Sequence, residues 1–271
     1  MNGRFHKYQA LGNDMIIIDP ASFPVPLTPV VIRLLCDRHF GIGGDGICYG
    51  PLPDQRPALA MRFYNPDGSE AEKSGNGLRI FARYVWDTGY AKGDTFAIYI
   101  NNEAVPVNLL DKQANRLKLG MGKLTFNWVD DPLPVDGELL RATAVSIGNP
   151  HCVIFHNDLS NIHRLGPQIE TAPIFPQRTN VQLVQVIDEH TIRITIWERG
   201  AGFTLASGTS ASAAAGTAVR MGYCTSPVEV QMDGGTAQVE IDDNWNVMLV
   251  GEVTAVYEGT LSADMIKELE K

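Results

Sequence analysis

The sequence has little of what membrane-bound, nucleic-acid-binding and exported proteins require. Its 271 residues contain no apolar run of roughly 18 or more, so we expect no membrane span. Acidic residues outnumber basic ones, and a net charge of −9 disfavours binding to nucleic acid or to an anionic membrane. The N-terminal stretch lacks the apolar segment of a signal peptide. These absences favour a cytoplasmic protein.

Cysteine is also sparse, and it shows no paired spacing. Cys36, Cys48, Cys152 and Cys224 all lie in apolar or strand-like surroundings, so we expect reduced core residues rather than disulfides. The alternative is a catalytic thiol at Cys152 beside His151. Adjacent residues of a strand point to opposite faces, which disfavours that pair.

Signals for a cofactor are missing as well. No His, Cys and carboxylate residues recur at metal-ligand spacing, so we expect no metal. The Gly-rich turn 41–46 is not followed by Lys-Ser/Thr and a helix, as a nucleotide-binding loop would be. No lysine has a recognisable Schiff-base setting, and we therefore expect no cofactor, pyridoxal phosphate included.

Two stretches of the chain repeat one pattern. Residues 65–77 and 198–210 are polar, Gly-rich loops that reach a Ser-Gly step, at Ser74 and Ser207, and then enter an apolar or small-residue helix. Serine is a favoured N-cap, and the free N–H groups of a helix start bind anions such as carboxylates. The sequence thus predicts two anion-binding helix starts about half a chain apart.

The repetition extends to a second motif. Residues 11–14 (Leu-Gly-Asn-Asp) resemble residues 147–150 (Ile-Gly-Asn-Pro) at nearly the same separation. Similarity at a fixed long period indicates two related half-domains, each with several strands and one long helix. We expect residues 1–120, completed by 255–271, to form one half and residues 121–254 the other. A ligand site where both helix starts face one molecule is the natural expectation.

Longer motifs carry a resemblance to a known family. Ser-Ile-Gly-Asn-Pro-His-Cys-Val (146–153), Glu-Arg-Gly-Ala-Gly (198–202) and Asn-Pro-Asp-Gly-Ser-Glu (65–70) with Ser-Gly-Asn-Gly (74–77) resemble the diaminopimelate epimerase family, over essentially the whole chain. The resemblance implies an α+β fold of two pseudo-symmetric halves, each a mostly antiparallel sheet curled around a central helix. It implies inversion of an amino-acid α-carbon without pyridoxal phosphate or metal. Diaminopimelate (LL to meso, a lysine and cell-wall precursor) is the best substrate candidate, and a homodimer is compatible with the family.

The resemblance also assigns site residues. It places Ser74 and Ser207 where the family has two catalytic cysteines, one on each face of the α-carbon. It makes His151 and Glu198 further candidates for acid–base work, Glu198 also as a ligand of the substrate amines. The remaining candidates bind substrate: Gly75, Asn76, Gly208 and Thr209 at the reacting carboxylate, Asn13 and Asn149 in the pocket, and Asn65, Asn180 and Arg199 at the distal end. A structural explanation stands beside each: serine is a common N-cap, and asparagine is common in Gly-containing turns.

Serine at both cysteine positions is the main departure from the family. A thiol has a pKa of about 8.5, whereas the pKa of a serine hydroxyl is far higher and nearer to that of water, a gap on the order of 10 kcal/mol. The chain is then an engineered Cys→Ser variant, a natural paralogue in which His151 or Glu198 assists serine or acts as the base, or a non-catalytic amino-acid-binding protein. Ile80, where a Cys is common, and Phe203, where Glu is usual, also depart from the family. Because an engineer removing two nucleophiles would not change them, they favour the natural paralogue.

Overall fold

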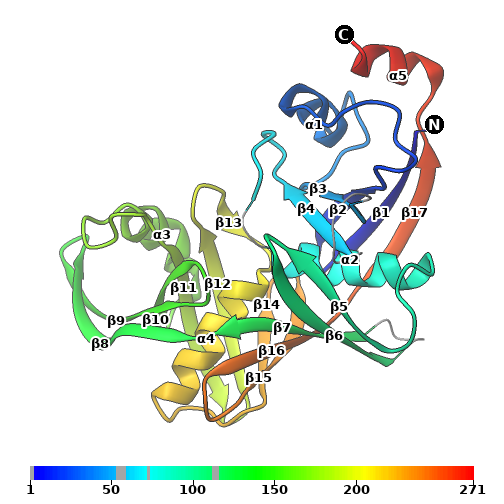
Figure 1. Cartoon of the computed structure of the whole chain (residues 1–271). Coiled ribbons are helices and arrows are strands. Elements are labelled where there is room, and N and C mark those ends of the chain that lie inside the picture. Colours follow the sequence, from blue (N-terminus) through cyan, green and yellow to red (C-terminus); the bar gives the residue numbers. More distant parts are fainter. Residues whose placement is uncertain (1–2, 53–58, 72–73, 112–115) are drawn as a thin grey trace. The chain divides into compact units, whose positions relative to one another are not determined.

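A computed structural model describes residues 3–52, 59–71, 74–111 and 116–271. The chain divides into two compact units, unit 1 (residues 1–119 and 252–271) and unit 2 (residues 120–251). Figure 1 shows their elements in sequence colours. No helix of the described residues is long and apolar enough to cross a membrane.

Unit 1 is a sheet with one central and two outer helices. Its strands are β1 (Arg4–Ala10), β2 (Asn13–Ile18), β3 (Ile47–Tyr49), β4 (Ala60–Tyr64), β5 (Thr95–Ile100), β6 (Glu103–Asp111), β7 (Arg116–Lys123) and β17 (Thr254–Thr260). Its helices are α1 (Pro29–Cys36), α2 (Gly75–Asp87) and α5 (Ala263–Leu269). The chain passes to unit 2 within β7.

Unit 2 is built from similar parts. Its strands are β8 (Thr125–Val135), β9 (Glu138–Ser146), β10 (Pro150–Phe155), β11 (Asn180–Asp188), β12 (Thr191–Glu198), β13 (Gly202–Thr204), β14 (Val228–Met232), β15 (Gly235–Ile241) and β16 (Asn246–Glu252). Its helices are the short η1 (Leu159–Asn161), α3 (Ile162–Glu170) and α4 (Gly208–Arg220).

The two units share one topology, which confirms the internal repeat. In unit 1 the strands pair in the order β17-β1-β2-β3-β4-β5-β6-β7, with β2–β3 and β4–β5 parallel and the other pairs antiparallel. In unit 2 the order is β8-β9-β10-β11-β12-β14-β15-β16, and the parallel pairs fall at the same two places, β10–β11 and β12–β14. Each half is therefore a mostly antiparallel α+β layer with its long helix inserted at the same point of the strand order.

The long helix is the centre of each unit. Leu78, Ile80, Phe81 and Val85 of α2 are at most 1% exposed and pack in one cluster with side chains of β1, β2, β4, β5, β6 and β7. Burial around a helix requires strands on several sides, and Figure 1 shows α2 lying against the sheet of its unit. Because the rest of each helix packs in its unit, the N-terminal end, which follows a polar loop, is where a ligand could bind.

Helix α4 is packed in another way, through small side chains. Its alanines are fully buried: Ala211, Ala213, Ala214, Ala215 and Ala218. A Cβ added at Gly216 would lie 2.2 Å from Leu124 Cδ1, so glycine is required for the closeness of this contact. Small residues here let the neighbouring strands approach the helix axis.

Two strands of unit 2 were not expected from the sequence. β8 contains Pro132 and Pro134, which argue against a strand, but it pairs only with β9 among the described strands, and an edge strand tolerates proline. β13 is a three-residue strand formed by the loop after β12. Its pairing with β12 folds the Glu-Arg-Gly loop back on itself, which fixes the approach to α4.

Candidate functional site

The start of α2 in unit 1 has the N-cap geometry that the sequence predicts. Ser74 has extended backbone angles, and its Oγ accepts a hydrogen bond from Gly77 N at 3.1 Å. Gly75 and Asn76 form the first turn, and Asn76 is buried. Glu72 and Lys73, which precede the cap, lie outside the described residues. The serine is thus an N-cap at the positive end of the helix.

Asn13 lies at the start of β2 and bonds to a carboxylate. Its Nδ2 donates to Asp45 Oδ2 at 3.0 Å, and the Asp14 backbone N–H donates to the same oxygen at 3.1 Å. Asp45 in turn pairs with Arg38 at 2.7 Å. The amide nitrogen of Asn13 is therefore used by the protein, which leaves its carbonyl oxygen as the group that can accept from a substrate amine.

Asn65 is held in its own turn. Its Nδ2 donates to Ser69 Oγ at 3.0 Å, and its backbone N–H bonds to Ser69 O. Gly68 in this turn has φ +92, and a Cβ there would lie 2.7 Å from Pro29. These contacts fit the structural explanation of Asn65 as a turn residue, and a role in the distal pocket stays a prediction.

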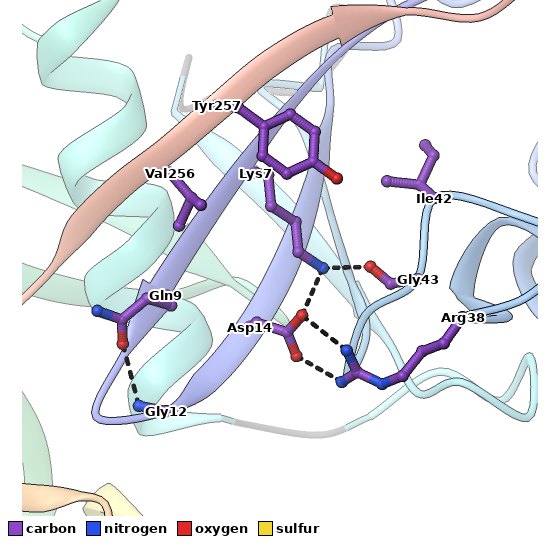
Figure 2. Close-up of a pocket in the computed structure, with 9 residues that line it drawn as sticks. All are labelled: Lys7, Gln9, Gly12, Asp14, Arg38, Ile42, Gly43, Val256 and Tyr257. Atoms are coloured by element: carbon purple, nitrogen blue, oxygen red, sulfur yellow. Dashed lines mark hydrogen bonds and ion pairs between the residues drawn. The ribbon is translucent and has the colours of Figure 1, made fainter.

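A hollow of about 440 Å³ on unit 1 is not the predicted substrate site (Figure 2). None of the predicted site residues lines it. Lys7, which points into it, is buried, bonds to the Gly43 carbonyl and pairs with Asp14 at 2.7 Å. Asp14 pairs in addition with Arg38, which also pairs with Asp45, so the two cations and two carboxylates here neutralise one another and offer no net charge to an ionic ligand.

The start of α4 in unit 2 combines a serine N-cap with a partly buried carboxyl. Ser207 Oγ accepts from Ser210 N at 3.5 Å and lies 3.3 Å from Thr209 Oγ1. Glu198, at the end of β12, accepts a hydrogen bond from the Thr204 hydroxyl at 3.1 Å, and the Ser207 hydroxyl lies close enough to lower its pKa. Burial raises the pKa of Glu198 above its usual range, against the lowering effect of the Ser207 and Thr204 hydroxyl groups. A serine thus lies in contact with a carboxylate of increased basicity.

His151 on β10 is buried and in its neutral form. Burial lowers its pKa to about 3, and the charge of Arg199 lowers it further, while contact with Gln182 acts in the opposite direction. Its Nε2 lies 3.0 Å from Asn149 Oδ1. His151 Nδ1 and Gln182 Oε1 have no hydrogen-bond partner among the described residues. A histidine with so low a pKa is a weak general base at neutral pH.

Asn180 joins two loops of unit 2. It lies beside His151 in the parallel β10–β11 register. Its Nδ2 donates to Pro150 O at 2.8 Å, and its Oδ1 accepts from the Arg199 backbone N–H at 3.0 Å. Both ends of the amide are therefore used in holding the Gly-Asn-Pro-His loop and the Glu-Arg-Gly loop together.

Glu170, at the end of α3, also holds the Glu-Arg-Gly loop, and no motif in the sequence predicted this role. Its Oε2 accepts from Trp197 Nε1 at 2.8 Å and its Oε1 from Gly200 N at 2.9 Å. Trp197 and Gly200 flank Glu198 and Arg199 in the sequence, so these two bonds hold the loop on both sides of that pair. Arg199 donates Nη1 to Gln177 O at 3.2 Å, and no carboxylate of the described residues pairs with it.

The predicted site residues thus fall into two groups, one in each unit. Unit 2 brings together eight of them within one hydrogen-bonded region: Asn149, His151, Asn180, Glu198, Arg199, Ser207, Gly208 and Thr209. Unit 1 holds Ser74, Gly75 and Asn76 at the start of α2, whereas Asn13 and Asn65 bond to neighbours in loops of their own.

Comparison with known proteins decides the family. A family model described as diaminopimelate epimerase matches residues 5–127 and 143–256. The chain belongs to the diaminopimelate epimerase family. A relative from Nostoc sp. (strain PCC 7120), "Diaminopimelate epimerase 2", is 44% identical and covers 97% of this chain and 96% of its own. A diaminopimelate epimerase from Moorella thermoacetica is 38% identical over 96% of this chain and 99% of its own.

Solved structures agree with the fold. A hydroxyproline epimerase from Agrobacterium vitis superimposes with a TM-score of 0.72 at 12% identity, over 96% of this chain and 92% of that one. Membership of the diaminopimelate epimerase family makes the protein an isomerase of the epimerase and racemase type. Its helix starts nevertheless carry serine, and its four cysteines are all buried. Burial raises the pKa of the Cys152 thiol, so this cysteine is no substitute nucleophile.

Proposed function

We propose that the protein inverts the α-carbon of diaminopimelate, interconverting its LL and meso forms without a cofactor, with Glu198 and Ser207 as one acid–base unit. The proximity of the partly buried Glu198 carboxyl to the Ser207 hydroxyl at the start of α4 carries this proposal. Serine alone is too weak a base, but serine that passes its own proton to a carboxylate need never exist as a free anion.

The proton of the α-carbon is transferred to Glu198 through Ser207. The C–H bond at the α-carbon breaks, its proton goes to Ser207 Oγ, and the Ser207 proton goes to Glu198, which becomes neutral. The electron pair of the C–H bond enters the substrate carboxylate as an enediolate, which the N–H groups of a helix start stabilise. A proton from solvent then reaches the opposite face of the carbon, and Glu198 releases its proton to solvent, so that the carboxylate and Ser207 return to their starting forms.

Glu198 suits the role of base better than His151. The pKa of Glu198 is raised, whereas that of His151 is lowered to about 3. A base works best when its pKa lies near the working pH, and the shift of Glu198 is toward that pH while the shift of His151 is away from it. We therefore assign His151 a neutral hydrogen-bonding role beside the reacting carbon.

Solvent deuterium incorporation tests the function. We expect the protein in D2O to introduce deuterium at the α-carbon of LL-diaminopimelate and to produce the meso form, as followed by proton NMR. Tight binding of diaminopimelate without exchange would instead support a binding protein. That second candidate is favoured by one observation, that both serines already serve as N-caps of their helices.

Arg199→Ala is expected to weaken binding of diaminopimelate by about 2–3 kcal/mol, that is by roughly 30- to 150-fold. The guanidinium lacks a carboxylate partner among the described residues and is partly buried, so a substrate carboxylate can pair with it. Isothermal titration measures the loss. Arg193→Ala is the matched control, because Arg193 is an exposed arginine of β12 that pairs with Asp233. Equal affinities for the two variants would mean that the distal carboxylate binds elsewhere.

A further inference from the structure

Arg79 is a buried cation in the first half of α2. It lies between Leu78 and Ile80 and is 0% exposed. Its Nη2 donates to Asn76 Oδ1, one turn toward the helix start. Its Nε and Nη1 are buried and have no hydrogen-bond partner within the part of the chain that the structure describes.

An arrangement of this kind is costly without an anion. Each buried donor that lacks an acceptor lowers stability, and an unpaired buried charge does so more strongly. Burial lowers the pKa of Arg79 to about 10, so the side chain remains a cation at neutral pH. No carboxylate in the described ranges forms an ion pair with it. The free protein therefore holds a positive charge that a ligand can neutralise.

The repeat shows that this cation belongs to one helix start only. Where α2 has Arg79, five residues after its cap, α4 has Ser212, whose hydroxyl donates to Gly208 O at 2.8 Å and is satisfied. Both helices begin with a serine cap and a Gly. Only α2 adds a full charge to the partial positive charge of its N-terminus, so an anion is held there more strongly than at α4.

We propose that Arg79 is a positioning residue that, through Asn76, holds a substrate carboxylate at the start of α2 and stabilises the enediolate formed there. This inference rests on the proposed function. By bonding to Asn76 Oδ1, Arg79 fixes the orientation of this amide in the first turn of α2. When the α-proton leaves, the carboxylate gains negative charge, so a fixed cation lowers the energy of the transition state more than that of the bound substrate.

Arg79→Met tests this inference, with two readouts. We expect the rate of α-proton exchange in diaminopimelate to fall by about 100-fold or more, mainly in kcat, as when an oxyanion donor is removed. We expect the melting temperature of the ligand-free protein to stay equal or rise, because an apolar side chain replaces an unpaired buried charge. Arg79→Lys should recover part of the exchange. Arg83→Met is the control from the same helix, since Arg83 pairs with Asp87 at 2.7 Å.

A structural role would give the opposite result. If Arg79→Met melts well below the native protein while the remaining folded enzyme exchanges at the native rate, Arg79 serves the fold alone and the inference is wrong. Glu72, which lies outside the described residues, is the nearest acidic residue in sequence. If Glu72→Gln and Arg79→Met lower the melting temperature equally, Glu72 is the counter-ion and the inference also fails.

Failure of the proposed function is separable from failure of this inference. If the native protein neither exchanges nor binds diaminopimelate, the melting temperature is measured with acetate, glycine, proline and glutamate as carboxylate probes. A rise in the native protein that Arg79→Met lacks supports the carboxylate role with another substrate. The same response in both proteins, or none in either, overturns it.

Discussion

Replacing both helix-start serines by cysteine, Ser74→Cys with Ser207→Cys, is expected to raise α-proton exchange in diaminopimelate by about 1,000-fold or more. The gain follows from the pKa gap on the order of 10 kcal/mol between a thiol and a hydroxyl, of which a 1,000-fold effect recovers roughly 4 kcal/mol. Both positions are N-caps, where the helix dipole favours a thiolate. Proton NMR in D2O measures the exchange.

The single variants should differ from each other. Ser207 already contacts Glu198, whereas no carboxylate is bonded to Ser74 among the described residues, so Ser74→Cys adds the group that is missing. Ser74→Cys alone should therefore increase exchange more than Ser207→Cys alone, and the double variant should show a thiol-like acid limb in its pH profile. A native protein that is already fast, and slower with two cysteines, would mean that the serines are no substitutes for thiols. Glu198 and His151 would then be the first residues to remove.

Glu198→Gln should reduce α-proton exchange by about 100- to 10,000-fold, the contribution of a general base. Glutamine keeps the shape and can still accept from Ser207 and Thr204, but it cannot take up a proton. The carboxyl must be ionised to act, so exchange in the native protein should rise with pH through the raised pKa of Glu198. That acid limb should lie above the ordinary glutamate value of 4.5 and be absent from Glu198→Gln.

Stability provides the control for this variant. Because the folded-state pKa of Glu198 is raised above its unfolded value, the protonated form contributes stability that is fully present below the unfolded pKa. That stability is lost as the pH rises through the folded pKa. At pH 7 the charged Glu198 therefore opposes folding, and Glu198→Gln should melt at the same or a higher temperature than the native protein. A large loss of stability together with unchanged exchange would assign Glu198 a structural role.

Much of the fold could be read from the chain because its determinants are local. Ser74 and Ser207 were expected to cap two helices, and they do, since a cap needs only its own side chain and an N–H three residues further on. The repeated Gly-Asn turns and helix starts likewise predicted two halves with the same topology. β8 was not predicted, because Pro132 and Pro134 are compatible with a strand only at the edge of a sheet. Whether a strand lies at an edge depends on the order of all strands in the sheet.

The chemistry of the site was decided by tertiary structure. The sequence supplied Glu198, His151 and Arg79 as residue types, but a pKa depends on burial and on partners from distant segments. β12 and α4 bring Glu198 to Ser207, whereas the sheet buries His151 and keeps it neutral. The core around α2 encloses Arg79 with two donors unsatisfied. The sequence by itself thus determined where the chain presents anion-binding helix starts, because capping is local. Tertiary packing determines which carboxyl can serve as a base and which cation lacks a partner. Desolvation depends on neighbours that are distant in sequence, so the sequence alone does not show it.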